Sequence, residues 1–211
     1  MRSTLLIALP KGRLFDAAVG LLQRAGVETD GGVGSRKLTF TDKGGQYEFV
    51  ALKPADVPVY VESGAVDAGI VGSDVLRELE CDVNEPLDLR IGLCRLAVAA
   101  IEGSDLAMLD HLRIATKYPR TATRFFSARH QHTHIVRLEG SVEIAPILGL
   151  ADAIVDLVET GRTLKENGLG IVEEIAPVSA KFVVNRTAMK TRNAAVRKLI
   201  TSLDKVIYAH P

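Results

Sequence analysis

The 211-residue sequence has no tryptophan, only two cysteines and no excess of either charge. Cys81 and Cys94 lie outside any C-x-x-C motif, which favours two free thiols in a reducing compartment. Lys and Arg together number 26, and so do Asp and Glu. Because nucleic-acid-binding proteins normally carry a basic excess, we expect no nucleic-acid partner.

Long hydrophobic runs are missing as well. The first apolar run, within MRSTLLIALPKGR, is too short for a signal peptide and is interrupted by Pro10. No run approaches the roughly 20 apolar residues of a membrane span. The composition, with 47% hydrophobic and 25% charged residues, is that of an ordinary globular protein. We therefore expect a cytoplasmic protein without a membrane partner.

Short apolar segments alternate with amphipathic segments along the whole chain, and this alternation predicts an α/β fold with largely parallel sheets. Strands are predicted at Leu5–Leu9, Lys37–Phe40, Glu48–Leu52, Ala68–Val71, Arg90–Ile101, Arg113–Thr116, His134–Leu138, Ala153–Val158 and Lys181–Asn185. Helices are predicted at Leu14–Ala25, Val57–Ser63, Ser73–Glu80, Thr121–Ala128, Glu143–Leu148, Thr163–Asn167 and Arg192–Ile207.

Two short segments echo each other: GAVDA at Gly64–Ala68 and GLADA at Gly149–Ala153. Each follows a predicted helix, enters a β-branched strand and leads to a polar turn. The match is short enough to arise by chance. A true repeat would mean two similar lobes, each presenting a strand-end turn to a shared cleft, where ligands of open α/β sheets bind.

The strand Ala153–Val158 runs directly into a polar loop, Glu159–Thr163, with the sequence ETGRT. Consecutive backbone N–H groups in a tight turn before a helix form an anion site, and Gly161 allows close approach to a ligand. Thr160 and Thr163 can donate hydroxyl hydrogen bonds, and Thr163 can also cap the helix. The pattern fits a plain Thr-capped turn equally well.

Two aspartates upstream of this loop favour the phosphate interpretation. Asp152 and Asp156 lie four positions apart, which places both on one face of a strand. Carboxylates beside a phosphate pocket suit ribose hydroxyls or a divalent cation. The sequence therefore predicts a ribose 5-phosphate as the ligand.

Three histidines, His130, His132 and His134, alternate as H-x-H-x-H up to the start of a predicted strand. Such spacing puts three imidazoles on one face, but no Cys or carboxylate stands close in sequence to complete a Zn²⁺ site. We favour a polar, solvent-facing strand and expect no protein-bound metal.

Four segments carry a resemblance to a known family. The segment Glu139–Leu169, EGSVEIAPILGLADAIVDLVETGRTLKENGL, closely resembles the signature of the ATP phosphoribosyltransferases of histidine biosynthesis. LPKGRL at Leu9–Leu14, DVPVYVESGAVDAGIVGSDVL at Asp56–Leu76 and RIATKYP at Arg113–Pro119 resemble the same family in the same order. The resemblance covers nearly the whole chain and is highly specific.

The resemblance implies two lobes with a type II periplasmic-binding-protein architecture and an active site in the cleft between them. Lobe I would comprise residues 1–92 and 182–211, because the terminal amphipathic helix is expected to pack back on the first lobe. Lobe II would comprise residues 93–181 and carry the phosphoribosyl pyrophosphate loop.

The family reaction joins N1 of ATP to C1 of phosphoribosyl pyrophosphate and releases pyrophosphate with inversion at C1. The resemblance implies that phosphoribosyl pyrophosphate binds to Asp152, Asp156, Glu159, Thr160, Gly161, Arg162 and Thr163. The departing pyrophosphate needs Mg²⁺, carried by the substrate phosphates, and nearby cations. The catalytic cations implied are Lys11, Arg13, Arg36 and Lys53.

ATP is expected to bind Ser73, Asp74, Lys117 and Tyr118. These assignments have simpler alternatives. Lys11 and Arg13 would also be normal as solvated charges, and Asp74 could cap a helix that begins at Val75. The family pattern has arginine where this chain has Lys53, and lysine lacks the bidentate phosphate geometry of arginine.

The chain ends at Pro211 and resembles the short form of the family, which lacks the histidine-binding regulatory domain. The resemblance implies a homodimer within a hetero-oligomer whose other subunit is a histidyl-tRNA-synthetase-like regulatory chain. Two alternatives remain open at this point. One is a non-catalytic two-lobed solute-binding protein, and the other is a phosphoribosyltransferase that acts on a purine or pyrimidine base.

Overall fold

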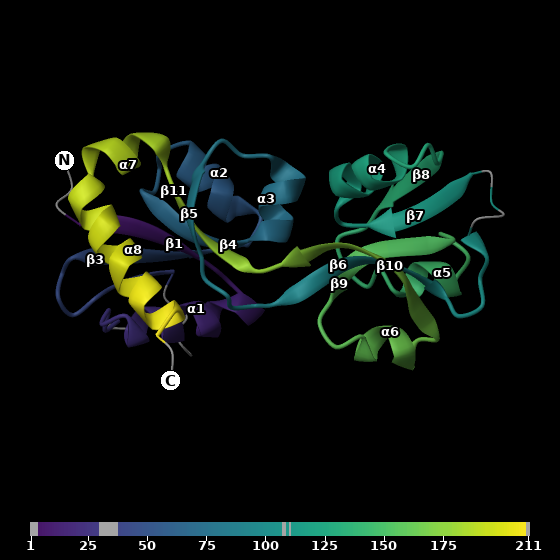
Figure 1. Ribbon diagram of the computed structural model, residues 1–211, viewed down its shortest axis with the longest axis horizontal. Helices are drawn as coiled ribbons and strands as arrows, with labels where there is room; N and C mark the ends of the chain where they lie inside the picture. The colour runs from purple at the N-terminus through teal and green to yellow at the C-terminus, as the bar shows by residue number, and fades with distance from the viewer. Residues whose placement is uncertain (1–3, 30–37, 107–108, 110, 210–211) are drawn as a thin grey trace. The chain divides into compact units, whose positions relative to one another are not determined.

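The computed structural model describes residues 4–29, 38–106, 109 and 111–209. The chain forms two compact units, with unit 1 made of Met1–Gly92 and Ser179–Pro211 and unit 2 of Leu93–Val178 (Figure 1). The chain therefore re-enters unit 1 at Ser179, three residues before residue 182, where the sequence predicted that lobe I resumes. The reason is that Ala180 and Lys181 already belong to a strand of the unit 1 sheet.

Unit 1 is built on a six-stranded sheet with the order β2-β3-β1-β4-β11-β5. Its strands are β1 (Leu5–Pro10), β2 (Thr39–Thr41), β3 (Tyr47–Leu52), β4 (Ala68–Gly72), β5 (Asn84–Asp88) and β11 (Ala180–Val184). Its helices are α1 (Arg13–Arg24), α2 (Asp56–Glu62), α3 (Ser73–Leu79), α7 (Arg186–Thr191) and α8 (Asn193–Ile207). Strands β3, β1 and β4 run parallel, so their carboxyl ends meet at one edge of the sheet.

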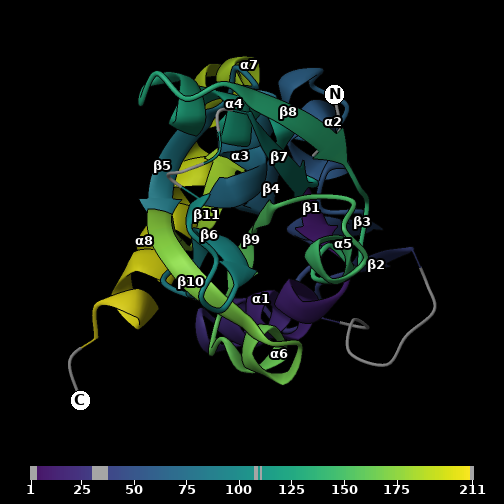
Figure 2. The ribbon, with the colours of Figure 1, turned by 90° about the vertical axis from the view of Figure 1, so that its right-hand side faces the viewer.

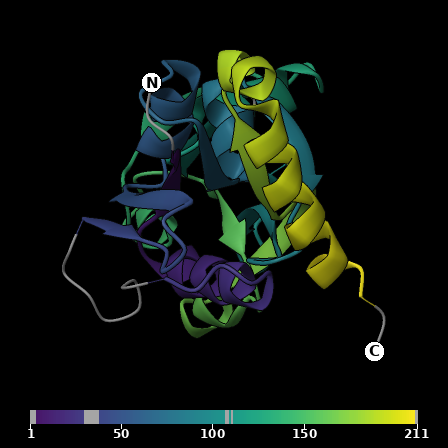
Figure 3. The same cartoon turned by 90° about the vertical axis from the view of Figure 1, so that its left-hand side faces the viewer.

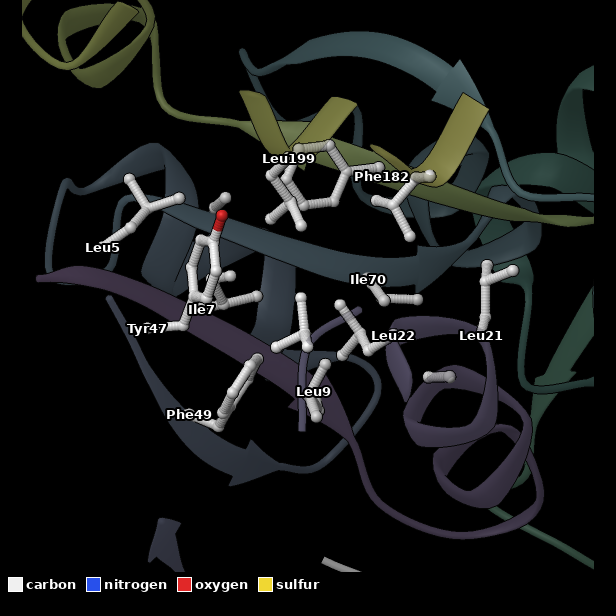
Figure 4. Close-up of a cluster of buried hydrophobic side chains, with 14 of the residues drawn as sticks. Leu5, Ile7, Leu9, Leu21, Leu22, Tyr47, Phe49, Ile70, Phe182 and Leu199 are labelled. Atoms are coloured by element: carbon white, nitrogen blue, oxygen red, sulfur yellow. The ribbon is translucent and has the colours of Figure 1, made fainter. Parts of the chain in front are cut away.

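Helices cover both faces of the unit 1 sheet. Leu22 of α1 and Leu199 of α8 pack with Ile7, Phe49 and Phe182 in the larger core, which Figure 4 shows in close-up. The terminal helix thus packs on the first unit, as expected (Figure 3). The opposite face is covered by α2 and α3 through a second buried cluster.

Unit 2 is built on a five-stranded sheet with the order β10-β6-β9-β7-β8. Its strands are β6 (Cys94–Ile101), β7 (Leu112–Thr116), β8 (Thr133–Arg137), β9 (Ala153–Val158) and β10 (Leu169–Val178), and its helices are α4 (Pro119–Ser127), α5 (Ile144–Ile147) and α6 (Arg162–Glu166). Strands β8, β7 and β9 run parallel. Helix α4 packs on one face of the sheet, whereas α5 and α6 pack on the other (Figure 2).

The two units repeat one arrangement of strands. Each sheet contains three parallel strands, followed by two strands that each pair antiparallel with the strand before. The orders are β3-β1-β4-β11-β5 and β8-β7-β9-β6-β10. The GAVDA and GLADA segments end in Ala68 and Ala153, which pair with Ile7 and Ile114 at equivalent places in the two sheets. The sequence echo therefore marks a structural repeat.

Asp67 of the GAVDA segment and Asp152 of the GLADA segment make the same two hydrogen bonds to the neighbouring strand. Asp67 donates its N–H to the Leu6 carbonyl at 2.9 Å and accepts the Leu6 N–H at 2.9 Å. Asp152 exchanges the same two bonds with Arg113, at 2.8 Å each. Each aspartate fixes the start of a central strand to its parallel neighbour. Within the described ranges, no helix is long and apolar enough to cross a membrane.

Candidate functional site

The predicted phosphate loop follows the carboxyl end of β9 in unit 2. Glu159 and Thr160 are exposed, and Gly161 adopts the left-handed conformation with φ of 76°. A side chain is strained at this φ, so glycine is the residue that suits the turn. The Arg162 N–H donates to the Thr160 hydroxyl at 3.3 Å and closes the turn. The loop is thus short, tight and accessible, as an anion site requires.

Helix α6 begins one residue earlier than predicted, at Arg162, and its N-cap is Gly161 rather than Thr163. The Arg162 guanidinium pairs with Glu166 at 2.7 Å, and its side chain is 83% exposed. Thr163 lies in the first turn of α6, with its side chain exposed and its carbonyl accepting from Asn167 at 2.9 Å. Both side chains therefore lie on the solvent side of the loop.

Asp156 lies on β9 close to this loop. Its side chain is on the same face of β9 as those of Ile154 and Val158, which belong to the buried cluster under α5 and α6, so it lies on the α6 face of the sheet. Its neighbour across the sheet is the small Ala97. The Lys117 ammonium, from the segment that follows β7, lies 3.9 Å from Asp156 Oδ1. A carboxylate and a cation thus lie together near the carboxyl ends of β7 and β9.

The structure contradicts the expected role of Asp152. This residue precedes the amino end of β9, whereas the loop follows the carboxyl end, and a six-residue strand separates them by about 20 Å. The carboxylate is engaged by Arg113 at 2.6 Å and 3.2 Å, and the same guanidinium donates to the Gly149 carbonyl at 2.8 Å. These bonds from Arg113 hold the pKa of Asp152 below its ordinary value. Asp152 is a structural residue.

Tyr118 also departs from expectation. Its ring is only 4% exposed and packs in the core of unit 2 with Ala122 and Phe126. A buried ring cannot offer its face to ATP, so the expected contact is wrong for Tyr118. Its neighbour Lys117 remains on the surface, with the ammonium 5.2 Å from the Tyr118 ring centroid and beside Asp156.

In unit 1, two predicted cations lie at the ends of neighbouring parallel strands. Lys11 follows β1 and Lys53 follows β3, and the last residues of these strands, Pro10 and Leu52, are paired. The Lys11 N–H donates to the Leu52 carbonyl at 2.7 Å, and both lysine side chains are exposed. Arg13, the first residue of α1, is exposed at the same edge. Arg36 lies outside the described residues.

The turn Gly72-Ser73-Asp74 follows β4, the other parallel neighbour of β1. Asp74 is 7% exposed, and its carboxylate lies so close to Gly72 that a Cβ on Gly72 would meet Oδ1 at 2.1 Å. Helix α3 begins at Ser73, as predicted, and its N-cap residue is Gly72, so Asp74 lies in the first turn rather than before a helix that begins at Val75. Ser73 donates its N–H to the Ser179 carbonyl at 2.9 Å and accepts the Ser179 N–H on Oγ at 3.3 Å.

The three histidines do not gather on one face. His130 lies in a turn with φ of 58°, and only His134 is part of β8. His132 lies beside His111, with ring centroids 6.0 Å apart. Among the described residues, no three His, Cys, Asp or Glu side chains are placed to hold a metal ion.

Comparison with known proteins identifies the family. A model of the ATP phosphoribosyltransferase family matches residues 53–205. ATP phosphoribosyltransferase of Caldanaerobacter subterraneus subsp. tengcongensis is 46% identical over 202 residues, which are 95% of this chain and 96% of that protein. Those of Oceanobacillus iheyensis (48% over 204 residues; 95% and 97% covered) and Acidithiobacillus ferrooxidans (47% over 210 residues; 97% and 98% covered) are equally similar. The chain belongs to the ATP phosphoribosyltransferase family.

Solved structures agree with this membership. A chain of the ATP phosphoribosyl transferase (HisG:HisZ) complex from Thermotoga maritima matches with a TM-score of 0.86 and 35% identity over 98% of both chains. The VFT2 domain of Bordetella pertussis BvgS matches with a TM-score of 0.62 at 14% identity, covering 100% of this chain and 89% of that one. The second match shows the fold alone. The α/β class with two units like a periplasmic binding protein, expected from the sequence, is confirmed.

Proposed function

We propose that this chain is the catalytic subunit of an ATP phosphoribosyltransferase. It joins N1 of ATP to C1 of phosphoribosyl pyrophosphate and gives phosphoribosyl-ATP and pyrophosphate, the first step of histidine biosynthesis. The observation that carries the proposal is the similarity to proteins named ATP phosphoribosyltransferase. These relatives are 46–48% identical over at least 95% of this chain.

Unit 2 would hold the phosphoribosyl group. We assign the 5-phosphate to the Glu159–Thr163 loop, whose backbone and hydroxyls are accessible after β9. We assign the ribose hydroxyls to Asp156, since a carboxylate accepts hydrogen bonds from vicinal hydroxyls. Lys117 was expected from the sequence to bind ATP, but we assign it to the phosphoribosyl group because its ammonium lies beside Asp156.

Unit 1 would supply the charges that stabilise the leaving pyrophosphate. Lys11, Arg13 and Lys53 lie at the carboxyl edge of the parallel strands, where α/β proteins bind ligands. We keep Arg36 as a further proposed cation on the family resemblance alone. The nearby Ser73-Asp74 turn is assigned to ATP. The transition state resembles an oxocarbenium ion, so the rate gain comes mainly from positioning and from leaving-group stabilisation.

We propose that Mg²⁺ enters with the substrate, chelated by the pyrophosphate oxygens. Mg²⁺ keeps several of its waters and is commonly bound through substrate phosphates rather than through an all-protein cage. The metal would neutralise charge that develops on the departing pyrophosphate.

We further propose a regulatory partner. The similar chain from Thermotoga maritima was solved as a HisG:HisZ complex. We expect this chain to form a homodimer and to assemble with a histidyl-tRNA-synthetase-like subunit that carries the histidine site. The partner would shift the catalytic chain between weakly and strongly active states.

The test of the catalytic proposal is pyrophosphate release in the presence of one or both substrates. We expect release only when ATP and phosphoribosyl pyrophosphate are supplied together, and Asp156→Ala should abolish most of it. The alternative, a non-catalytic solute-binding protein, predicts no release with either mixture. The likeness to solved structures at 14% and 17% identity shows the fold alone and does not favour that alternative.

A further inference from the structure

Thr116, the last residue of β7, has a completely buried side chain. Its hydroxyl donates to the Val155 carbonyl of β9 at 2.6 Å and accepts the Tyr118 N–H at 2.9 Å. Both hydrogen bonds are buried. One hydroxyl therefore ties the end of β7 to β9 and also shapes the turn that leads from β7 into α4.

The two partners of this hydroxyl flank the Lys117–Asp156 pair. Val155 immediately precedes Asp156, and Tyr118 immediately follows Lys117. The hydroxyl thus fixes the backbone on one side of each charged residue. The lysine directly follows β7 and the carboxylate lies on β9, so the spacing of the two groups depends on how β7 and β9 are joined at this end.

The fold does not require a hydroxyl at this position. In the repeat formed by unit 1, Ile7 pairs with Ala68 as Ile114 pairs with Ala153, which makes Leu9 the counterpart of Thr116. Leu9 is fully buried in the apolar core. The same place in the same strand arrangement accepts an aliphatic side chain, so strand pairing alone does not explain Thr116.

We propose that Thr116 is a positioning residue for phosphoribosyl transfer, holding Lys117 against Asp156 so that the carboxylate meets the ribose hydroxyls in a fixed orientation. The inference rests on the function proposed above. Thr116 itself is completely buried, so we do not assign it a direct contact with a substrate. It acts by fixing the backbone next to Lys117 and next to Asp156.

The test uses Thr116→Val, which keeps the side-chain shape and removes the hydroxyl, and Thr116→Ser, which restores the hydroxyl. We expect Thr116→Val to raise KM for phosphoribosyl pyrophosphate about five- to tenfold, the usual effect of one lost hydrogen bond. KM for ATP should change less, and Thr116→Ser should stay within about twofold of wild type. Thr116→Ala is a second variant without the hydroxyl. If the valine variant does not fold, Thr116→Ala must show the larger rise in KM for phosphoribosyl pyrophosphate than for ATP.

Arg113→Gln is the matched control. Arg113 joins the same two strands at their amino ends through Asp152, away from the loop. We expect Arg113→Gln to lower the unfolding temperature while both KM values stay near wild type. An equal rise in KM in this control would show that the effect is only structural, and the proposal would fall.

A double-mutant cycle tests the route through Lys117. Thr116→Val should add little to the defect of Lys117→Met, because residues that act through one another are not additive. Full additivity, or wild-type kinetics in both hydroxyl-free variants, overturns the inference. The wild-type chain distinguishes the proposed function from the role of Thr116. If the wild-type chain forms no phosphoribosyl-ATP, the proposed function fails. The role of Thr116 is then tested by the calorimetric affinity of the variants for phosphoribosyl pyrophosphate.

Discussion

Lys117 and Asp156 lie side by side near the carboxyl ends of β7 and β9, with Nζ 3.9 Å from Oδ1. The two side chains are 39% and 25% exposed, but Asp156 Oδ1 itself is buried. Lys117 therefore places a cation beside a carboxylate oxygen that solvent hardly reaches. The pair and the loop that follows β9 make up the proposed phosphoribosyl site in unit 2.

The first prediction concerns the loop hydroxyls. Thr160→Ala combined with Thr163→Ala should weaken binding of phosphoribosyl pyrophosphate by about 1–3 kcal/mol, because hydrogen bonds to a charged phosphate are lost. Isothermal calorimetry measures the change. Thr123→Ala, at an exposed threonine of α4, is the control and should bind normally. An unchanged affinity in the double variant would mean that the loop is only a turn.

The second prediction concerns the Ser73-Asp74 turn. Gly72→Ala would place Cβ at 2.1 Å from Asp74 Oδ1, so the carboxylate must move. We expect weaker ATP binding with little change for phosphoribosyl pyrophosphate, measured by competition binding. Gly20→Ala lies in α1 with no atom within 4 Å of the new Cβ, and it should bind normally and be slightly more stable. Normal ATP affinity in Gly72→Ala would remove this turn from the ATP site.

A pH-dependent contribution to stability is expected from Asp152. Arg113 lowers its pKa in the folded state, so the stabilisation is fully present above the unfolded pKa of about 3.9 and is lost as pH falls through the lower folded pKa. The unfolding free energies of wild type and Asp152→Asn, from urea titrations, should differ most near neutral pH. The gap should narrow below about pH 4. A gap that stays constant down to pH 2 would contradict the ion pair as its source.

Activity should depend on Mg²⁺ through the substrate. Excess EDTA should abolish turnover, and added Mg²⁺ should restore it at concentrations that saturate phosphoribosyl pyrophosphate rather than the protein. A steady-state titration at several substrate concentrations distinguishes these cases. Full turnover in EDTA would show that the cations of unit 1 suffice for the leaving group.

Histidine control should require the partner. We expect the isolated chain to work at a reduced rate and to resist inhibition by histidine. Addition of the regulatory subunit should raise turnover and introduce histidine inhibition together, because that subunit would supply both the activating contact and the histidine site. Strong inhibition of the isolated chain by histidine would place the effector site within this chain.

The sequence predicted the parallel strands. β1 and β4 are continuous apolar runs, whereas β3, β7 and β9 are mainly apolar with one charged residue each, and such segments followed by polar turns are readily recognised. The edge strand β10 was missed, because Glu173 and Glu174 lie in it and its exposed pattern lacks alternation. Arg90–Ile101 was predicted as one strand, but Arg90 and Gly92 have positive φ and interrupt it.

The helix predicted at Arg192–Ile207 is confirmed as α8 (Asn193–Ile207), but the short helix α7 before it was missed. The structure has α7 and α8 separated at Arg192, whose φ of −117° interrupts the helix. The start of α7 has its own signal in Asn185, whose side chain accepts the N–H groups of Thr187 and Ala188. An asparagine at the end of an apolar strand resembles a strand end, so the cap was read as part of the strand.

The site was harder to predict than the fold, and Asp152 shows why. Spacing along a strand gives the face of a residue but not the end of the sheet on which it acts. Its partner Arg113 could not be recognised without knowledge of the strand pairing. Thr116 was missed for a related reason, since a threonine at a strand end looks ordinary until its buried hydroxyl is seen to bracket two charged residues.

The most direct test of the central claim follows C1 of the ribose. Phosphoribosyl pyrophosphate labelled with ¹³C at C1 is incubated with ATP, Mg²⁺ and the chain, and the product is separated and examined by NMR and mass spectrometry. The account predicts a single adduct in which the labelled C1 is bonded to N1 of the adenine, with the opposite configuration at C1. Labelled ribose phosphate without an adenine, or a bond to any other adenine nitrogen, would contradict it.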